Sequence, residues 1–394
     1  MEALKTPPLT QFESGVAAPR YIPALPSLDL GMLMPPRRAS LPFPFNAPGV
    51  SYGYFARNAV WTLARVFELF RGEVLVPAYH HGVEVEALID AGVTPRFYPV
   101  GPRMEVDPAD VARRIQPKKT RALYLIHFLG FPGPVEAFQK LAEEHGLVLI
   151  EDCALALFSR RESQPLGSFG DASVFSLYKT LPLPNGGALV LNEGRPRGLP
   201  RLPEPPRLSM LSHLAASYLQ GLEFRRGALG RTLRKMARGL SRRAVASTGI
   251  ERVATGTQHF AREHARLGMS AISRRILAAQ DVAGIVERRR RNFFFLQSRL
   301  RDLGPSLIPE LPAGVCPLFF PLRVEDKTRI QRLLGLRGIE TVDFWRYGHP
   351  ACLPGEFPDV EKLRQSVLEI PIHQDLSPAQ MSFVARAIHE VLPR

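Results

Sequence analysis

The chain has 394 residues, 45% of them hydrophobic, which is enough for one large domain with a buried core and a smaller second one. No run of 18 or more apolar residues is present, the segment after Met1 does not resemble a secretory signal, and the three cysteines are widely spaced. We therefore expect no membrane span, secretion, disulfide framework or zinc site. The expected location is a reducing cytoplasm. Most of the net charge of +14 comes from residues 201–292, where 19 basic residues face 6 acidic ones, and no motif that reads nucleic acid accompanies it.

The first 50 residues are rich in proline and lack a sustained hydrophobic period, which predicts an irregular segment. From residue 58 onward, helical and strand patterns alternate. Helices are predicted at 59–70, 83–91, 108–115 and 135–145, and strands at 73–77, 96–100, 122–126, 147–150, 172–176 and 188–191. This alternation predicts an α/β domain over residues 51–200, with a mostly parallel sheet covered by helices on both faces.

Residues 201–292 are predicted to form a basic, mainly helical linking region. Eight Arg and Lys side chains lie between Arg225 and Arg243, a stretch without any acid, and Leu229, Leu233 and Met236 add an apolar stripe. This pattern fits contact with a membrane surface or another polyanion. It also fits a solvated helix face, or one that is paired with acids of another subunit.

Residues 293–394 are predicted to form a smaller C-terminal α+β domain, entered through a long helix at 281–303. It contains a strand at 315–324, a helix at 327–336, a strand at 369–372 and a closing amphipathic helix. The closing helix is expected to begin at Ser377-Pro378, because serine is a preferred N-cap and proline suits the first helical position.

Two polar residues at the ends of apolar runs indicate covalent cofactor chemistry. The run that starts at Leu147 ends in Asp152, and Lys179 precedes the glycine pair Gly186-Gly187. A lysine amine can form a Schiff base with an aldehyde, and a carboxylate can keep a pyridine nitrogen protonated, so the pair favours pyridoxal phosphate (PLP). The alternatives are a surface lysine before a turn and a strand-end carboxylate that caps the next helix.

Five segments, by their order and spacing, make the chain resemble the DegT-type sugar aminotransferases. These are PLP enzymes of the aspartate aminotransferase fold, fold type I. The matching segments are residues 74–79, 127–130, 150–154, 170–176 and 179–187, and the resemblance extends from about residue 56 to the C-terminus.

The resemblance implies how the ring of the cofactor is held. Lys179 would form the Schiff base and afterwards carry protons between the substrate and the cofactor, and Asp152 would bind the pyridinium N–H. His81 stands where the family places an aromatic ring stacked on the cofactor, although the adjacent His80 makes that choice ambiguous.

Five further residues complete the implied cofactor site. The phosphate would lie where Arg57 and Asn58 lead into the first helix, with the Ser176 hydroxyl adding a hydrogen bond. Ala154 belongs to the segment that follows the aspartate and is included in the site. His127, at a strand end, would be either a cofactor contact or a structural residue.

Three departures from the family pattern indicate a divergent branch. Leu155 stands where the family has a glutamine that can hydrogen-bond the ring oxygen. The segment between Ser176 and Lys179 is two residues shorter than usual. The asparagine and arginine that the family sends into the neighbouring subunit's site appear here as Arg266 and Gly268.

The activity implied by the resemblance is transfer of an amino group, expected from glutamate, to a keto group of a nucleotide-linked sugar in glycan or polysaccharide biosynthesis. A cytoplasmic homodimer with active sites between its subunits is implied as well, and no metal ion is expected. A PLP enzyme for a non-sugar substrate is a second hypothesis. A third is a catalytically silent binding or scaffold protein with the PLP fold, which Leu155 and the altered phosphate turn keep open.

Overall fold

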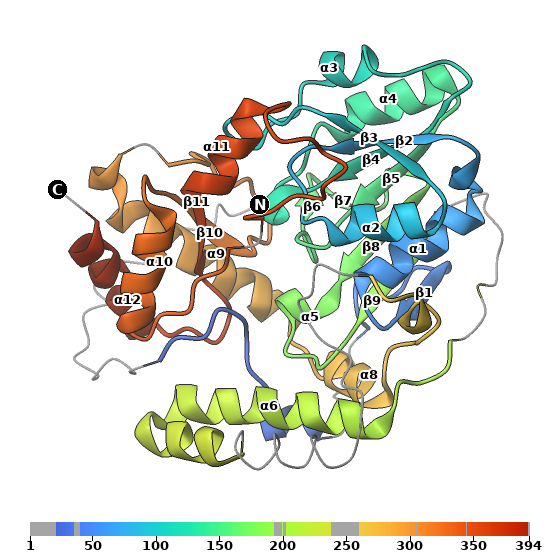
Figure 1. Ribbon diagram of the computed structural model, residues 1–394. Helices are drawn as coiled ribbons and strands as arrows, with labels where there is room; N and C mark the ends of the chain where they lie inside the picture. Colours follow the sequence, from blue (N-terminus) through green and yellow to red (C-terminus); the bar gives the residue numbers. More distant parts are fainter. Residues whose placement is uncertain are drawn as a thin grey trace.

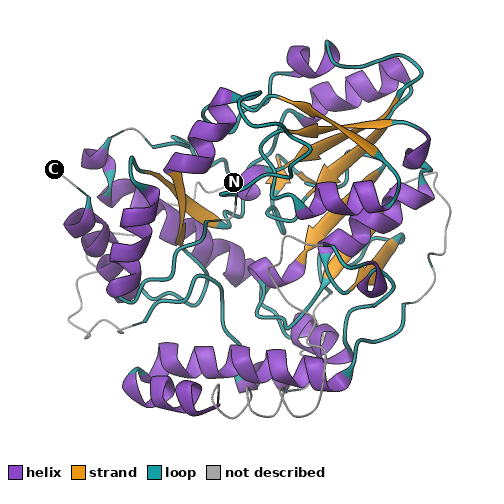
Figure 2. Ribbon diagram, in the orientation of Figure 1, coloured by secondary structure: helices purple, strands orange, loops and turns teal. Residues whose placement is uncertain are grey.

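The computed structural model describes residues 21–34, 40–192, 199, 202–237, 260–304, 306–343 and 345–392. A larger unit is built around a wide sheet and a smaller one around a two-stranded sheet, with helix α6 (Arg207–Arg226) lying beneath both (Figures 1 and 2). Among the helices described, none combines the length and apolar character needed to cross a membrane.

The larger unit contains a seven-stranded sheet in the order β1-β9-β8-β5-β4-β2-β3. Its strands are β1 (Val50–Gly53), β2 (Glu73–Pro77), β3 (Thr94–Tyr98), β4 (Thr120–Ile126), β5 (Val148–Asp152), β8 (Ala172–Ser176) and β9 (Gly187–Leu191). Strand β9 is antiparallel to β1 and β8, and the other neighbouring pairs are parallel, so the mostly parallel sheet is confirmed. Strand β1 was not predicted, because it is short and lies at the end of the proline-rich segment.

Helices cover both faces of this sheet, as predicted. They are α1 (Ala56–Val66), α2 (Val83–Asp90), α3 (Pro108–Ala112) and α4 (Val135–His145). Helices α1 and α2 lie on one face, whereas α3 and α4 lie on the other (Figure 1). This follows from right-handed crossovers, because the chain moves toward β3 through α1 and α2 and back toward β5 through α3 and α4. Aliphatic residues of the strands, such as Leu75, Leu123 and Ile150, are fully buried between the two helix layers.

The smaller unit packs helices against the antiparallel pair of β10 (Phe319–Arg323) and β11 (Val367–Pro371). Its helices are α9 (Val282–Arg299), α10 (Lys327–Leu336) and α12 (Pro378–Val391), whereas α11 (Pro358–Ser366) buries Val360 and Leu363 in the apolar cluster of the larger unit. Ser377 and Gln380 form a reciprocal capping box at the start of α12, which confirms the predicted N-terminus of that helix. Helix α11 was not predicted. The unit has its own apolar cluster, to which Phe293, Phe320 and Ile370 belong.

The remaining elements are short. They are η2 (Leu30–Leu33), η3 (Leu69–Arg71), η4 (Phe128–Gly130), β6 (Arg160–Arg161), β7 (Gln164–Pro165), α5 (Leu177–Thr180), η5 (Arg262–His264), α8 (Ala271–Ala278) and η6 (Arg301–Leu303). Residues 228–237 form a further helix after α6. Domain boundaries at residues 50, 200 and 292 stay a prediction, and residues 1–20 lie outside the part of the chain described.

Candidate active site

A cavity of about 640 Å³ lies where the two units meet, beyond the carboxyl ends of β5 and β8. The larger unit lines it with the start of α1, with Asp152 and Ser176 at the strand ends, and with Lys179. The smaller unit contributes Val342, Asp343, Trp345, Arg346 and Tyr347. A larger groove is lined by Asp171 and Asn192. Because neither Asp152 nor Lys179 lines it, we do not assign the cofactor chemistry to this groove.

Asp152 ends β5 and is held by two hydrogen bonds. The Tyr124 hydroxyl donates to Oδ2 at 2.6 Å, and the backbone N–H of Ala154 donates to Oδ1 at 2.8 Å. Burial, followed by the negative charge of Glu84, raises the pKa of Asp152 from 3.8 to about 6, against the opposing effect of these two bonds and of Lys179. The carboxyl group is therefore fixed in direction and mostly ionised at neutral pH.

Lys179 lies on α5, the single helical turn that follows β8. Two backbone hydrogen bonds hold this turn in place. Leu177 N–H donates to the Gly186 carbonyl at 3.0 Å, and Gly186 N–H donates to the Tyr54 carbonyl at 2.9 Å. Gly186 has a φ of 152°, and a Cβ on Gly187 would lie 2.3 Å from the carbonyl carbon of Phe55. The glycine pair thus lets β9 approach the start of α1 and places Lys179 beside the cavity.

His81 and Ser176 present polar atoms that have no hydrogen-bond partner among the described residues. The Nδ1 of His81 and the Oγ of Ser176 are both buried, and both residues line the cavity. Burial, followed by the positive charge of Lys179, lowers the pKa of His81 to about 3, so the imidazole is neutral. Such buried polar atoms are costly unless a ligand satisfies them, which indicates that the cavity is built to hold a polar molecule.

The first turn of α1 offers an anion site. Phe55 is the N-cap and supplies no side-chain hydrogen bond to the first amides, and Ala56 and Arg57 line the cavity. The Arg57 guanidinium lies 4.1 Å from the centre of the Phe55 ring, and burial lowers its pKa from the ordinary value. Amides and the positive end of a helix, with an arginine beside them, suit a phosphate group.

Two of the predicted site residues do not line the cavity. The Asn58 side chain donates to the His264 carbonyl, which turns it toward the segment before α8. His127 is buried behind β5, where its Nε2 lies 3.0 Å from Glu151 Oε2 and its Nδ1 accepts from Gly133 N–H at 3.1 Å. These contacts favour the structural alternative for His127 and turn the Asn58 side chain away from the cavity, and a cofactor contact of either residue stays a prediction. Arg57, His81, Asp152, Ala154, Ser176 and Lys179 are brought together around one cavity.

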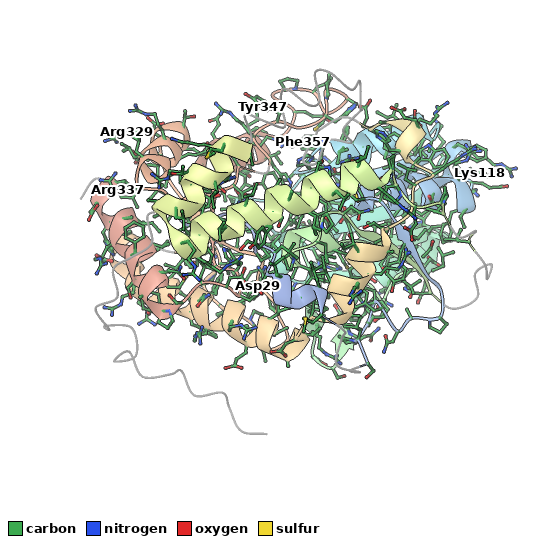
Figure 3. All side chains as sticks on the ribbon, turned by 90° about the horizontal axis from the view of Figure 1, so that it is seen from below. Asp29, Lys118, Arg329, Arg337, Tyr347 and Phe357 are labelled. Carbon is green, nitrogen blue, oxygen red and sulfur yellow. The ribbon has the colours of Figure 1, made fainter. Side chains whose placement is uncertain are left out.

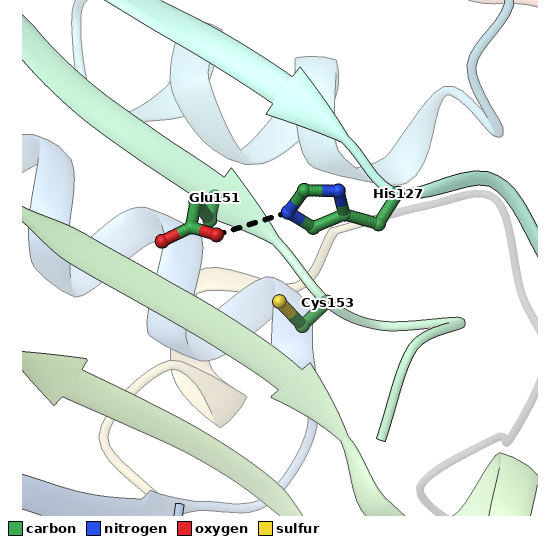
Figure 4. A group of neighbouring side chains, drawn as sticks. All are labelled: His127, Glu151 and Cys153. Atoms are coloured by element: carbon green, nitrogen blue, oxygen red, sulfur yellow. Dashed lines mark hydrogen bonds and ion pairs between the residues drawn. The ribbon is translucent and has the colours of Figure 1, made fainter. Parts of the chain in front are cut away.

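His127, Glu151 and Cys153 form a buried cluster whose possible ligand atoms lie within 4.8 Å of one another (Figure 4). Both Glu151 oxygens are already engaged, because the backbone N–H groups of Gly167, Phe169 and Gly170 donate to them at 2.7–2.8 Å. Burial raises the pKa of the Cys153 thiol, so it stays protonated. A metal ion requires a thiolate and open carboxylate lone pairs, so this cluster fits a structural role in fixing residues 167–170.

Several residues of the site were not found from the sequence. Tyr124 orients Asp152, and its only signal is a tyrosine within an otherwise aliphatic strand. Glu84 lines the cavity and accepts from the His81 backbone N–H at 2.8 Å. Trp345 and Tyr347 line the cavity from the smaller unit, and an aromatic-rich stretch of the sequence was a signal for them.

Comparison with known proteins agrees with this geometry. Residues 58–197 match the DegT/DnrJ/EryC1/StrS aminotransferase family. GDP-perosamine synthase of Vibrio cholerae is 37% identical over 123 residues, which are 30% of this chain and 33% of that protein. The dTDP-3-amino-3,4,6-trideoxy-alpha-D-glucose transaminase of Streptomyces venezuelae is 27% identical over 81% of this chain and 76% of its own length. The solved structure of the sugar aminotransferase CalS13 from Micromonospora echinospora is 20% identical and superposes with a TM-score of 0.60 over 87% of this chain and 88% of that one.

Residues 58–197 thus match the model of this aminotransferase family, and the α/β fold of the chain is like that of the solved CalS13 structure. Both agree with the predictions from the sequence. The matches to the first curated relatives span about a third to two fifths of their length. The resemblance predicted toward the C-terminus is carried by the structural likeness and by the longer match to the Streptomyces transaminase.

Proposed function

We propose that this protein is a PLP-dependent aminotransferase that moves an amino group, from glutamate, onto a keto group of a nucleotide-linked sugar. The observation that carries the proposal is that Lys179 and Asp152, from separate strand ends, line one cavity. They are close enough for the charge of Lys179 to lower the pKa of Asp152. An amine and a carboxylate in such a cavity are what a pyridine aldehyde requires at its two ends.

The residues present fit PLP, because its ring nitrogen, ring face, aldehyde and phosphate each have a matching group. Asp152 would hold the pyridine nitrogen, the neutral imidazole of His81 would lie against the ring, and the phosphate would bind the first turn of α1 with Arg57 and the unpartnered hydroxyl of Ser176. Bound there, PLP would supply an electron sink for carbanion chemistry at the substrate.

The residues of the chain would then perform the positioning and the proton movements. Lys179 Nζ would hold the aldehyde end and move a proton at the reacting carbon of the substrate. The bonds from Tyr124 and Ala154 would keep the Asp152 carboxylate pointed at the ring nitrogen. Trp345 and Tyr347 would cover the site and limit the access of water, since they come from the smaller unit across the cavity.

The substrate class is proposed from two kinds of support. The names of GDP-perosamine synthase and of the Streptomyces transaminase refer to nucleotide-linked amino sugars. In this chain, Arg346 and Tyr347 stand at the cavity, and a cation beside an aromatic ring suits a diphosphate next to a nucleobase. We propose a role in polysaccharide biosynthesis, a homodimeric assembly and a cytoplasmic location on the same family resemblance.

Leu155 is the observation that favours a second candidate, a silent binding protein of the same fold. It lines the cavity and cannot donate a hydrogen bond to a ring oxygen. A protein that only holds PLP would keep the cofactor but would not respond to an amino donor.

Absorbance of the PLP-loaded protein distinguishes these candidates. The aminotransferase should be yellow, lose its visible band when glutamate is added, and recover the band when a keto sugar nucleotide follows. A yellow protein that no amino donor changes would support the silent candidate. A protein that takes up no PLP would overturn both. A band lost with glutamate and restored only by non-sugar keto acids would place the substrate in another class.

A further inference from the structure

The hairpin formed by α6 and the helical residues 228–237 exposes large apolar side chains in the part of the chain that the structure describes. The inner side of α6 packs against the body through Met210, His213 and Phe224. The opposite side of the same helix repeats exposed apolar residues at three- and four-residue spacing: Leu208, Leu211 and Ala215. Leu208 and Leu211 are 60% and 56% exposed. Because both sides of α6 are apolar, its outer side differs from an ordinary solvated helix face.

The second helix of the hairpin adds a matching stripe. Leu229, Leu233 and Met236 recur at helical spacing and are 63%, 39% and 61% exposed. The two helices lie side by side across one surface of the molecule (Figure 3). Five of the twelve exposed large hydrophobic side chains in the part of the chain that the structure describes thus belong to this hairpin. Such a concentration marks an interaction surface. We call the exposed apolar residues of both helices the hairpin face.

The hairpin, residues 207–237, carries six Arg and Lys side chains and one acid, Glu223, and its Arg225 lies 3.8 Å from Asp29, an exposed acid of another segment. Arg231 and Arg234 are bound at 3.1 and 2.9 Å by Glu223, which is itself buried. Arg226 and Lys235 are exposed and form no ion pair with any residue that the structure describes. In the sequence, Arg238, Arg242 and Arg243 follow before the next acid. These last three lie outside the described residues, so only the part of the predicted basic stretch up to residue 237 is seen here.

We propose that the hairpin face binds the surface of an anionic phospholipid membrane, with the two helices lying in the interface plane. The leucines and Met236 would enter the boundary between headgroups and acyl chains, and Arg226 and Lys235 would meet the lipid phosphates. A second copy of the chain fits this face less well. An isologous contact would set these cations against their own counterparts, and the acid of the hairpin, Glu223, is already paired inward. The proposal is independent of the enzymatic one.

Vesicle sedimentation of the full-length, PLP-treated protein tests this inference. The protein should pellet with vesicles of phosphatidylcholine and phosphatidylglycerol, remain in solution with phosphatidylcholine alone, and be released by salt. Two double variants, Leu208→Gln with Leu211→Gln and Arg226→Gln with Lys235→Gln, should each weaken binding about tenfold. Leu336→Gln and Lys140→Gln, at side chains that are 74% and 76% exposed elsewhere, should leave binding unchanged.

Three results would overturn the proposal. The first is no pelleting with anionic vesicles, and the second is equal pelleting with neutral ones. The third combines two measurements: light scattering shows a larger oligomer that the Leu208→Gln with Leu211→Gln variant no longer forms, and the wild type does not bind vesicles. This result would make the hairpin face a subunit interface. Circular dichroism melting of every variant separates loss of binding from loss of fold. The Arg226→Gln with Lys235→Gln variant removes only exposed side chains and keeps the test decisive if the leucine variant does not fold.

Discussion

Arg289 of α9 donates a hydrogen bond at 3.2 Å to the carbonyl of Thr180, the residue that follows Lys179. The same guanidinium, which is 1% exposed, donates to Gln374 Oε1 at 2.8 Å and to the Leu318 carbonyl at 2.9 Å. Gln374 also donates to the Thr180 carbonyl, at 3.0 Å. Two side chains of the smaller unit therefore hydrogen-bond the end of the turn that carries Lys179.

Arg289→Met should lower the free energy of unfolding by about 2–3 kcal/mol, because it leaves buried carbonyls without their donor. It should also weaken PLP binding, because the Thr180 carbonyl at the end of the Lys179 turn keeps only the hydrogen bond from Gln374. Urea unfolding and a PLP titration measure the two effects. Arg288→Met on the same helix is the matched control, as Arg288 is 40% exposed and only 3.9 Å from Asp281, and it should cost less than about 0.5 kcal/mol. Equal losses in the two variants would contradict the proposed support.

Asp152 should make the stability of the cofactor-free protein depend on pH. The pKa of Asp152 is about 6 in the folded protein, above its ordinary value of 3.8. The stability that the protonated carboxyl group adds to the fold is therefore fully present below pH 3.8 and is lost as the pH rises through about 6. The stability of wild type relative to Asp152→Asn should therefore fall by about 3 kcal/mol between about pH 4 and about pH 8. Urea unfolding of both proteins across this range measures it. A stability difference that stays constant would show that this carboxyl group has no raised pKa.

Glu151→Gln should lower stability by about 2–4 kcal/mol without any link to metal. The carboxylate holds the backbone N–H groups of Gly167, Phe169 and Gly170 and the ring of His127 in a fully buried position. Chelator or added zinc should leave the thermal unfolding of wild type unchanged. Glu144→Gln, at an exposed side chain 3.7 Å from Lys140, should be neutral. A melting temperature that falls with chelator and is restored by zinc would instead make the cluster a metal site.

The sequence was informative where local pattern and chain order determine the outcome. The strands that end in Asp152 and Ser176, the glycine pair after Lys179 and the cap at Ser377 all follow from short-range rules and were found. The side on which a strand-end residue projects was harder to assign. Glu151 and Asp152 project to opposite faces because they are neighbours in a strand, and His127 pairs with Glu151, away from the cavity.

Contacts between distant parts of the chain were also beyond these rules. Trp345 and Tyr347 reach the cavity only through the packing of the smaller unit on the larger one, and no local spacing connects them to Asp152. Glu84 had no signal at all, since an acid on an amphipathic helix is ordinarily solvated. The apolar stripe of Leu229, Leu233 and Met236 was visible in the sequence. That Leu208 and Leu211 of α6 are exposed could be seen only in the structure.

The most direct measurement is the identity of the lysine that holds PLP, obtained by borohydride reduction of the loaded protein followed by peptide mass spectrometry. The proposed site predicts label on Lys179, and no label and no turnover in Lys179→Ala. Lys327 is the informative rival, because it is buried and its Nζ lies 2.5 Å from Asp343, which lines the same cavity. Label on Lys327, or no label on any lysine of the wild type, would contradict the assignment.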